Sequence, residues 1–459
     1  MASANQNLFA KYDIVVIGGG PVGLSTALEC AKAGRKVLVL EQSVFFNQSG
    51  SSGDLVRMFR TAYTEDFMAT LAVQSMSLWD ELEAEAGEPL RMMSGLMNFG
   101  DPNYGAGGPE GTLLGPIPNL NKYNMAYTRL NRDDIQEQYP FQNLPEGWEG
   151  LDMPDNGCIN VPLLLRTLHR LCTARGVDLF EYATVGQIAA DTSNGYPSAN
   201  WVVRGEIRDP RGVSAQARKF SFRTDKIAIT AGAYVNHVLY PSFGFTLDLS
   251  IWEMVYAYYT LDPRIQFPKM WFQFEEDASD GTSNLFYGFP ALPWGPPNLC
   301  RIAVDAATNI IADPSQRSPS VIPSPDLANT RAWVSEHVLG VGPDVLPALA
   351  GTCLQTNVSD NMFVLDFVPV RYLPAHRPGA ENSIAVFTAG WAMKFVPLLG
   401  RVLSQLVVDG QAPEYDISHF SMDRKPDGKP IIRDGPVATQ KEALHGHRTK
   451  GSSLHHLGH

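Results

Sequence analysis

The amino-acid sequence predicts an α/β protein that also carries a second, β-rich domain. Two observations predict this fold class: a strand, glycine turn, helix and strand in succession over residues 12–41, and aromatic-rich alternating segments over residues 252–305. The chain has 459 residues. At roughly 150 residues per domain, this length allows about three domains, or two large ones. We therefore expect full hydrophobic cores that need neither disulfides nor a structural metal.

The first element is a short, β-branched, nearly all-apolar run over residues 12–17, typical of a strand buried on both faces of a parallel sheet. A glycine-rich turn over residues 18–23 follows at once, and residues 24–33 have helical character. Residues 37–40 form the next apolar run, which ends at Glu41. This order predicts a Rossmann-type dinucleotide-binding unit.

Each part of this unit has a physical task. Gly18 permits the tight turn, Gly20 lets the backbone approach a pyrophosphate, and Gly23 allows close packing of the helix, whose N-terminus offers free N–H groups. Glu41 is placed to accept a hydrogen bond from a ribose hydroxyl. The alternative is a glycine-rich turn of an α/β fold that binds no ligand.

A second apolar run, over residues 226–233, again ends in small residues. It resembles a strand that passes beside the cofactor in FAD-binding folds, and this resemblance favours FAD over NAD. The segment 49–63 resembles the stretch after the second strand in the monomeric sarcosine oxidase family, which includes pipecolate, tryptophan and fructosyl amino acid oxidases. Further matching segments follow in the family's order, over residues 76–83, 157–177, 353–357, 360–369 and 390–400.

The resemblance covers roughly residues 10–425. It implies a monomeric FAD-dependent enzyme that acts on a small amine or amino acid, with O₂ or another electron acceptor. It also implies a Rossmann-type FAD-binding domain interleaved with an antiparallel-sheet substrate domain. The expected boundaries are 1–88, 155–240 and 345–425 for the FAD-binding domain, 89–154 and 241–344 for the substrate domain, and 426–459 for a polar, disordered tail.

Arg57 and Arg60 stand three positions apart in the segment 49–63. If this segment is helical, both arginines share one face; the alternative is a surface pair bound to Asp54 or Glu65. The resemblance implies that Arg57 lies near the flavin and that Arg60 holds the substrate carboxylate, which a planar guanidinium suits. The same segment contributes Ser52 to the expected cofactor site.

Cys353 is one of five widely spaced cysteines, and composition alone makes it a buried small hydrophobe. The resemblance implies instead that its sulfur is bonded covalently to the 8α-methyl carbon of the flavin. Gln355 stands where the family usually has an aromatic residue, which marks a different environment here.

Lys394 lies inside an otherwise apolar run, where an unpaired charge is costly. The alternative is a side chain that extends to solvent at a helix start. The resemblance implies that Lys394 binds the substrate carboxylate or the flavin, and that the backbone from Gly390 onward lies beside the isoalloxazine ring. Trp391 and Ala392 replace the family's histidine and glycine.

Arg301 falls where many family members have the lysine tied to oxygen activation, and Asp305 falls where they have a histidine. A cation beside the flavin stabilises superoxide as it forms. Arg301 can supply that charge, but Asp305 can also neutralise it. Oxidase activity is therefore less firmly predicted than amine oxidation.

Charge and cysteine usage limit the classes of partner and compartment. The net charge of −12 argues against non-specific binding to nucleic acid or to an anionic membrane, because both require a basic face. No apolar run approaches the ~20 residues of a membrane-spanning helix. The odd number of cysteines, with no pair at zinc spacing, favours a reducing, cytoplasmic compartment and no metal site.

The leading functional hypothesis is an FAD-dependent oxidation of the C–N bond of a carboxylate-bearing amino acid or N-substituted amine. Arg60 and Lys394 would hold the carboxylate, an imine would form, and O₂ would yield H₂O₂. One alternative keeps this half-reaction in a dehydrogenase or biosynthetic cyclase. The other is a non-catalytic protein with a structural flavin. The individual substrate stays open.

Overall fold

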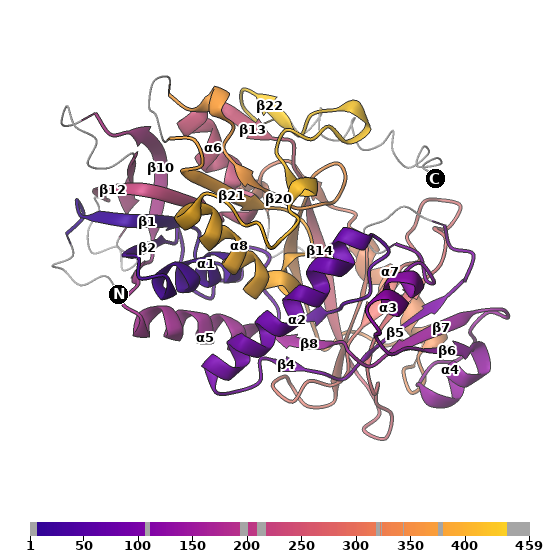
Figure 1. The fold of residues 1–459 in the computed structure, drawn as a ribbon. Coiled ribbons are helices and arrows are strands. Elements are labelled where there is room, and N and C mark those ends of the chain that lie inside the picture. Colours follow the sequence, from indigo (N-terminus) through magenta and orange to yellow (C-terminus); the bar gives the residue numbers. More distant parts are fainter. Residues whose placement is uncertain are drawn as a thin grey trace.

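The computed structural model contains two large β-sheets, and helices cover one face of the first sheet (Figure 1). The sheet that contains β1, β2 and β12 lies on the left of Figure 1, and the strands β5, β6 and β7 of the second sheet lie on the right. The structure describes residues 7–105, 111–192, 201–208, 217–317, 322, 324–342, 344–374 and 380–437.

The first sheet has eight strands within these described residues. Its centre is parallel, with β21, β12, β1, β2 and β9 side by side. The long β12 also pairs antiparallel with β11 along its first half, which extends the sheet to β10. The strands are β1 Lys11–Ile17, β2 Val37–Leu40, β9 Asp178–Phe180, β10 Ala183–Ala190, β11 Trp201–Ile207, β12 Arg218–Ile229, β20 Val364–Phe367 and β21 Ile384–Thr388.

Both faces of the parallel centre are buried, as its apolar runs predict. Val16 and Val39 face a helical layer that contains α1 (Pro21–Lys32), α5 (Val161–Ala174) and α8 (Val396–Asp409). The alternate side chains belong to the core on the opposite face, which includes residues of β10, β11 and α6 (Val235–Phe243). The predicted strands at 12–17 and 37–40 are confirmed, and the segment 226–233 is a strand to Ile229 followed by the predicted turn of small residues. The helix predicted for 24–33 begins earlier, at Pro21, because proline is well tolerated in the first turn.

The second sheet has nine strands in the described part of the chain, and nearly all of its pairings are antiparallel. One face packs on α7 (Ser324–His337) through a core that contains Trp271 and Trp333. The predicted aromatic strands between 252 and 305 are confirmed. The strands are β5 Leu96–Gly100, β6 Thr128–Asn131, β7 Glu149–Met153, β14 Ser250–Thr260, β15 Met270–Phe274, β16 Phe286–Gly288, β17 Leu299–Val304, β18 Ile310–Ile311 and β19 Leu349–Asn357.

Smaller elements connect the two sheets. One three-stranded sheet contains β3 (Val56–Phe59), β8 (Gly157–Asn160) and β4 (Arg91–Met92), and a two-stranded sheet contains β13 (Phe245–Leu247) and β22 (Ile432–Asp434). The other helices are α2 Asp66–Ala86, α3 Ile117–Lys122 and α4 Arg132–Gln138. Short 3₁₀ helices are η1 Gly232–Tyr234, η2 Pro314–Gln316, η3 Val370–Tyr372, η4 Ala392–Phe395, η5 Ser418–Phe420 and η6 Pro426–Gly428.

Some sequence-based expectations differ from this structure. Arg57 lies in the strand β3, so a shared helical face with Arg60 is wrong. Residues 426–437 are not a disordered tail, because β22 pairs with β13; the rest of the expected tail lies outside the described residues. The expected boundary at 345 assigns β19 to the FAD-binding domain, although β19 pairs with β14 of the second sheet. The interleaved division as a whole stays a prediction.

In the ranges that the structure describes, no helix has both the length and the apolar character needed to cross a membrane.

Candidate active site

The glycine turn between β1 and α1 is shaped by close packing. Gly18 has φ +108°, and a Cβ there would lie 2.5 Å from the carbonyl oxygen of Thr230. A Cβ on Gly23 would lie 2.0 Å from the carbonyl oxygen of Gly18. At Gly20 the nearest such atom is Ser52 Oγ at 3.8 Å, so this glycine leaves open space at the N-terminus of α1. Free helical N–H groups in such a space favour an anion.

Glu41 follows β2 beside this turn. Its carboxylate accepts hydrogen bonds from the backbone N–H groups of Gly19 and Ser43, each at 2.9 Å. Burial raises the pKa of Glu41, although both hydrogen bonds act in the opposite direction. The predicted contact of Glu41 with a ribose stays a prediction.

One cavity of about 620 Å³ contains most of the residues singled out from the sequence. It extends from the glycine turn past β19 to the segment that follows β21. Two predicted residues are not among its lining. Gly23 packs against the turn, and Arg60 is buried with its guanidinium 4.8 Å from the ring of Tyr63. The predicted residues that line it are Gly18, Gly20, Glu41, Ser52, Arg57, Arg301, Cys353, Gly390 and Lys394.

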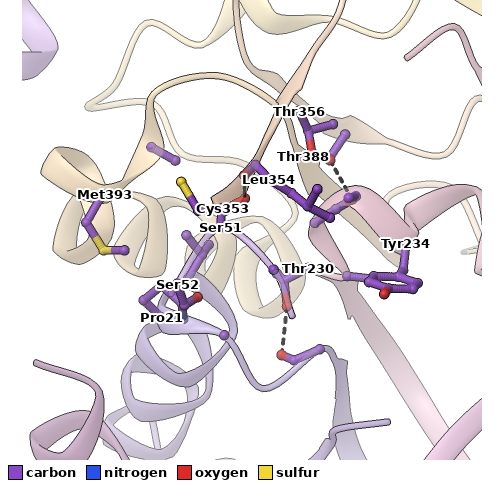
Figure 2. A pocket seen from close by; sticks show the side chains of 18 of the residues that line it. Pro21, Ser51, Ser52, Thr230, Tyr234, Cys353, Leu354, Thr356, Thr388 and Met393 are labelled. Carbon is purple, nitrogen blue, oxygen red and sulfur yellow. Dashed lines mark hydrogen bonds between the residues drawn. The ribbon is translucent and has the colours of Figure 1, made fainter. Parts of the chain in front are cut away.

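Cys353 lies on β19, and the loop before β3 packs against this strand. Ser51 Oγ donates to the carbonyl of Leu354 at 2.6 Å, and Arg57 Nη2 donates to the carbonyls of Ser51 at 3.0 Å and Gly53 at 2.8 Å. Figure 2 shows Cys353 with Ser51 and Leu354 around it. The loop before β3 therefore holds in place the part of β19 that carries Cys353, and the same loop also lines the cavity.

Asp54 joins this loop to the second sheet. Its carboxylate lies 2.7 Å from Arg301 Nε and 3.0 Å from Arg57 Nη1, and it accepts a hydrogen bond of 2.5 Å from the hydroxyl of Tyr258. The sequence left open whether Asp305 neutralises Arg301; the ion pair of Arg301 is formed with Asp54 instead. The guanidinium of Arg301 contacts Asp54 and donates to the hydroxyl of Tyr287 at 3.1 Å, although Asp305 lies only four residues farther along the chain.

The inner face of the second sheet supplies one wall of the cavity. Side chains alternate between the faces of a strand, so Arg301 faces the cavity while Cys300 and Ile302 belong to the core against α7. Asp305 lies just beyond the end of β17 and also lines the cavity. Aromatic residues that the sequence did not single out as site residues complete this wall, namely Phe272, Tyr287 and Phe289.

Lys394 lies in η4, at the far end of the cavity. The backbone carbonyl of Lys394 accepts hydrogen bonds from Trp79 Nε1 at 2.8 Å and Ser75 Oγ at 3.1 Å, which fasten η4 to α2. Burial lowers the pKa of Lys394 to about 8; Tyr63 raises it, Arg60 lowers it further and Asp305 raises it. The ammonium group lies 5.6 Å from the centre of the Tyr63 ring.

Asp305 is the acidic group of this end of the cavity. Its enclosure raises its pKa to about 6, although Arg60, Lys394 and Arg301 act in the opposite direction. The site therefore combines an anion-binding turn, a cysteine, a buried lysine and a carboxylate along one cavity.

A family model described as FAD dependent oxidoreductase (DAO) matches residues 13–406. The chain belongs to this family. The match includes the glycine turn, Cys353 and Lys394, and it confirms the resemblance, the fold class and the choice of FAD.

Proteins of similar sequence and structure support this family membership. A Dictyostelium discoideum protein named "Putative bifunctional amine oxidase" is 48% identical over 430 residues, which are 92% of this chain; the chain spans only 38% of that relative's length. The N-methyl-L-tryptophan oxidase of Salmonella agona is 24% identical over 90% of this chain and 99% of its own. The structure of NikD, titled an unusual amino acid oxidase essential for nikkomycin biosynthesis, superposes with a TM-score of 0.76 at 32% identity, over 90% of this chain and 97% of NikD.

The cavity of the oxidoreductase fits FAD. Gly20 leaves room at the helix N-terminus where a pyrophosphate binds, because a Cβ there would meet no atom closer than 3.8 Å. Glu41 lines the cavity after the second parallel strand, where a ribose is bound in this type of fold. The residues that would hold FAD are therefore those of the turn, Glu41, Ser52, Arg57 and the wall that contains Cys353.

Proposed function

We propose that this oxidoreductase oxidises the C–N bond of an amino acid or N-substituted amine that bears a carboxylate, with an imine as product. One observation carries the proposal: a single cavity joins the glycine turn to the buried Lys394 and the half-buried carboxylate of Asp305. The names of the relatives, an amine oxidase and an N-methyl amino acid oxidase, support the same class of substrate.

FAD, when bound, supplies the two-electron oxidant of this reaction. The protein's own residues provide binding and orientation. The ammonium of Lys394 attracts the substrate carboxylate, and the burial of Lys394 strengthens that attraction. Arg60 is buried close enough to shift the pKa of both Lys394 and Asp305, so its positive charge also favours an anionic group at this end.

The test of this function is an anaerobic reduction screen of the purified holoenzyme. Sarcosine, pipecolate, proline, aromatic amino acids and fructosyl amino acids are added one at a time, and the visible flavin absorbance is followed. We expect at least one of them to bleach the flavin. Full retention of colour with every compound would contradict the proposal and favour a structural flavin.

The electron acceptor defines a second candidate. O₂ as acceptor gives H₂O₂, but the charge of Arg301 is offset by Asp54 at 2.7 Å. A neutralised cation stabilises superoxide less well, and this observation favours a dehydrogenase or oxidative cyclase. Stopped-flow mixing of the reduced enzyme with air separates the two: reoxidation within seconds identifies an oxidase, and persistence for minutes identifies a dehydrogenase or cyclase.

Lys394 is proposed to bind the carboxylate, and Lys394→Met tests this role. Removal of a buried charge partner typically costs about 2–5 kcal/mol, so we expect KM for an amino acid substrate to rise by roughly 30-fold or more, with little change for its amide. Lys269→Met is the matched control, because Lys269 pairs with Asp152 and does not line the cavity. Equal effects of Lys394→Met on acid and amide would contradict the role.

Cys353 is proposed to attach the flavin covalently. Cys353 lies in the cavity wall, on the strand β19 that the loop beside the glycine turn holds in place through Ser51. Cys353→Ser should release flavin into the supernatant after acid precipitation, whereas wild type and the buried control Cys300→Ser should keep it in the pellet. Release from wild type would exclude the covalent bond.

A further inference from the structure

Asp305 has an unusual position among the charged groups of the cavity. Its carboxylate lines the cavity, yet within the described residues it has neither a side-chain hydrogen bond nor an ion pair. Arg301, the guanidinium nearest in sequence, is engaged by Asp54. A partly buried charge without a partner is costly, and the described residues give the half-buried Asp305 carboxylate no direct partner, so a ligand group of opposite charge can serve as one.

Lys394 has the opposite charge and lines the same cavity. No ion pair joins its ammonium to the Asp305 carboxylate, although each shifts the pKa of the other. Two opposite charges that line one cavity without forming an ion pair can each bind a different group of one ligand. A molecule that carries both an ammonium and a carboxylate group complements this arrangement, whereas a simple amine or a simple carboxylate leaves one of the two charges unpaired.

We propose that Asp305 binds the ammonium group of a zwitterionic amino acid whose carboxylate lies at Lys394, and that Asp305 accepts one proton from that ammonium group. This inference rests on the proposed function and narrows its substrates to zwitterions. It also makes Asp305 a catalytic residue, because only a neutral amine has the lone pair that a C–N double bond requires.

The proton step balances without any co-reactant. One N–H bond of the ammonium breaks, its electron pair stays on nitrogen, and the proton forms an O–H bond with the Asp305 carboxylate. The pKa of about 6 suits this role, since Asp305 is ionised at neutral pH yet is a stronger base than an ordinary aspartate. The described groups that act on it are Arg60, Lys394 and Arg301, with Tyr104 and Tyr287 also coupled to it.

The binding test uses two probes of the same shape on the holoenzyme. N,N,N-trimethylglycine carries a permanent cation that cannot be deprotonated, and 3,3-dimethylbutanoate has a neutral carbon in place of that nitrogen. Titrations are followed by the change in visible flavin absorbance. We expect wild type to prefer trimethylglycine by at least roughly tenfold and Asp305→Asn to lose this preference. Equal affinities in wild type would overturn the inference, whatever the variant does.

The control variant is Asp277→Asn. Asp277 also acts on Tyr104, its pKa is also raised by burial, and it does not line the cavity. The same substitution there should leave the ratio of the two affinities unchanged. If both variants lost the preference for trimethylglycine equally, the preference would come from the overall negative charge of the protein, and the role of Asp305 would be overturned.

A second measurement addresses the proton. The apparent second-order rate of anaerobic flavin reduction, measured against pH with a reactive amino acid, should fall below about pH 6, where Asp305 becomes protonated. We call this decrease in rate the acidic limb of the pH profile. Asp305→Asn should reduce the flavin more slowly and lack the acidic limb, and Asp305→Glu should restore part of the rate and the limb. Asp277→Asn should keep both the rate and the limb. An unchanged limb in Asp305→Asn would overturn the inference alone, whereas failure of every amino acid to reduce wild type would overturn the proposed function.

Discussion

Asp54 shows how one residue organises the site. It is fully buried, adopts φ 88° and holds Arg57, Arg301 and Tyr258 at once. Its carboxylate therefore links the loop beside the cofactor turn to two strands of the second sheet. Because the Arg57 and Arg301 guanidinium groups share this carboxylate, the net charge of the three side chains is +1 and not +2.

We predict that Asp54→Asn destabilises the protein by about 3–5 kcal/mol, since the buried Arg301 loses its charged partner. Asparagine tolerates the positive φ, so backbone strain does not contribute. Tyr258→Phe removes only one hydrogen bond and should cost about 1 kcal/mol. Denaturant unfolding of the three proteins measures both effects, and equal losses would contradict the central role of the carboxylate.

Residues that a family pattern contains could be assigned from the sequence, and residues defined by tertiary contacts could not. Cys353 and Lys394 stand in recognisable segments, and both line the cavity. Asp54 was recognised only as a possible partner of the Arg57 and Arg60 pair, because Arg301 and Tyr258 are distant from it in sequence and its φ cannot be read from the residue type. Asp305 was recognised as a departure from the family, but its role depended on the direction taken by the Arg301 side chain.

At the scale of elements, the turn between β1 and α1 contains glycines that serve two different purposes. Gly23 is required by packing, since its Cβ would overlap the carbonyl of Gly18 at 2.0 Å. Gly20 is not required by packing, since its surroundings are open. One position therefore belongs to the stability of the fold and the other to ligand binding.

We predict opposite consequences for the two alanine substitutions. Gly23→Ala should lower the free energy of unfolding by about 1–3 kcal/mol because the helix must move away from the turn. Gly20→Ala should leave unfolding nearly unchanged but weaken FAD binding, measured by fluorescence titration in a Cys353→Ser background. Gly342→Ala is the control, since apart from the chain neighbours no atom of the described residues lies within 4 Å of a Cβ placed there. Similar stability losses for Gly20→Ala and Gly23→Ala would contradict this separation.

The strands of the parallel centre were predictable because a run buried on both faces has a simple apolar signature. The segment around Arg57 was ambiguous, since polar and small residues allow helix or strand, and pairing of β3 with β8 decided the outcome. The pairing of β22 with β13 joins short segments more than 180 positions apart in the chain. Such long-range pairing leaves no local pattern.

At the scale of the whole molecule, the cavity lies between the two large sheets. The glycine turn comes from the first sheet, whereas Arg301 and Cys353 come from the second. A ligand that fills the cavity contacts both sheets and is expected to stabilise them as one unit.

We predict that free FAD raises the Tm of the Cys353→Ser apoprotein as a single transition. At a concentration 100 times Kd, a ligand specific for the folded state adds about 2.7 kcal/mol. Differential scanning calorimetry at increasing FAD concentration measures this. Two transitions, of which FAD shifts only one, would show that binding involves one sheet alone.

The strand order also determines when each strand of the first sheet can find its partner during synthesis of the chain. Lys11 pairs with Arg223, and the parallel partner of Ile229 on the other edge is Val386. At ~5–20 residues per second of synthesis, β1 waits about 10–40 s for β12 and a similar interval again for β21. Because Cys353 is synthesised within that second interval, a covalently bound flavin would report that translation has passed β19, whether or not β21 has yet been made.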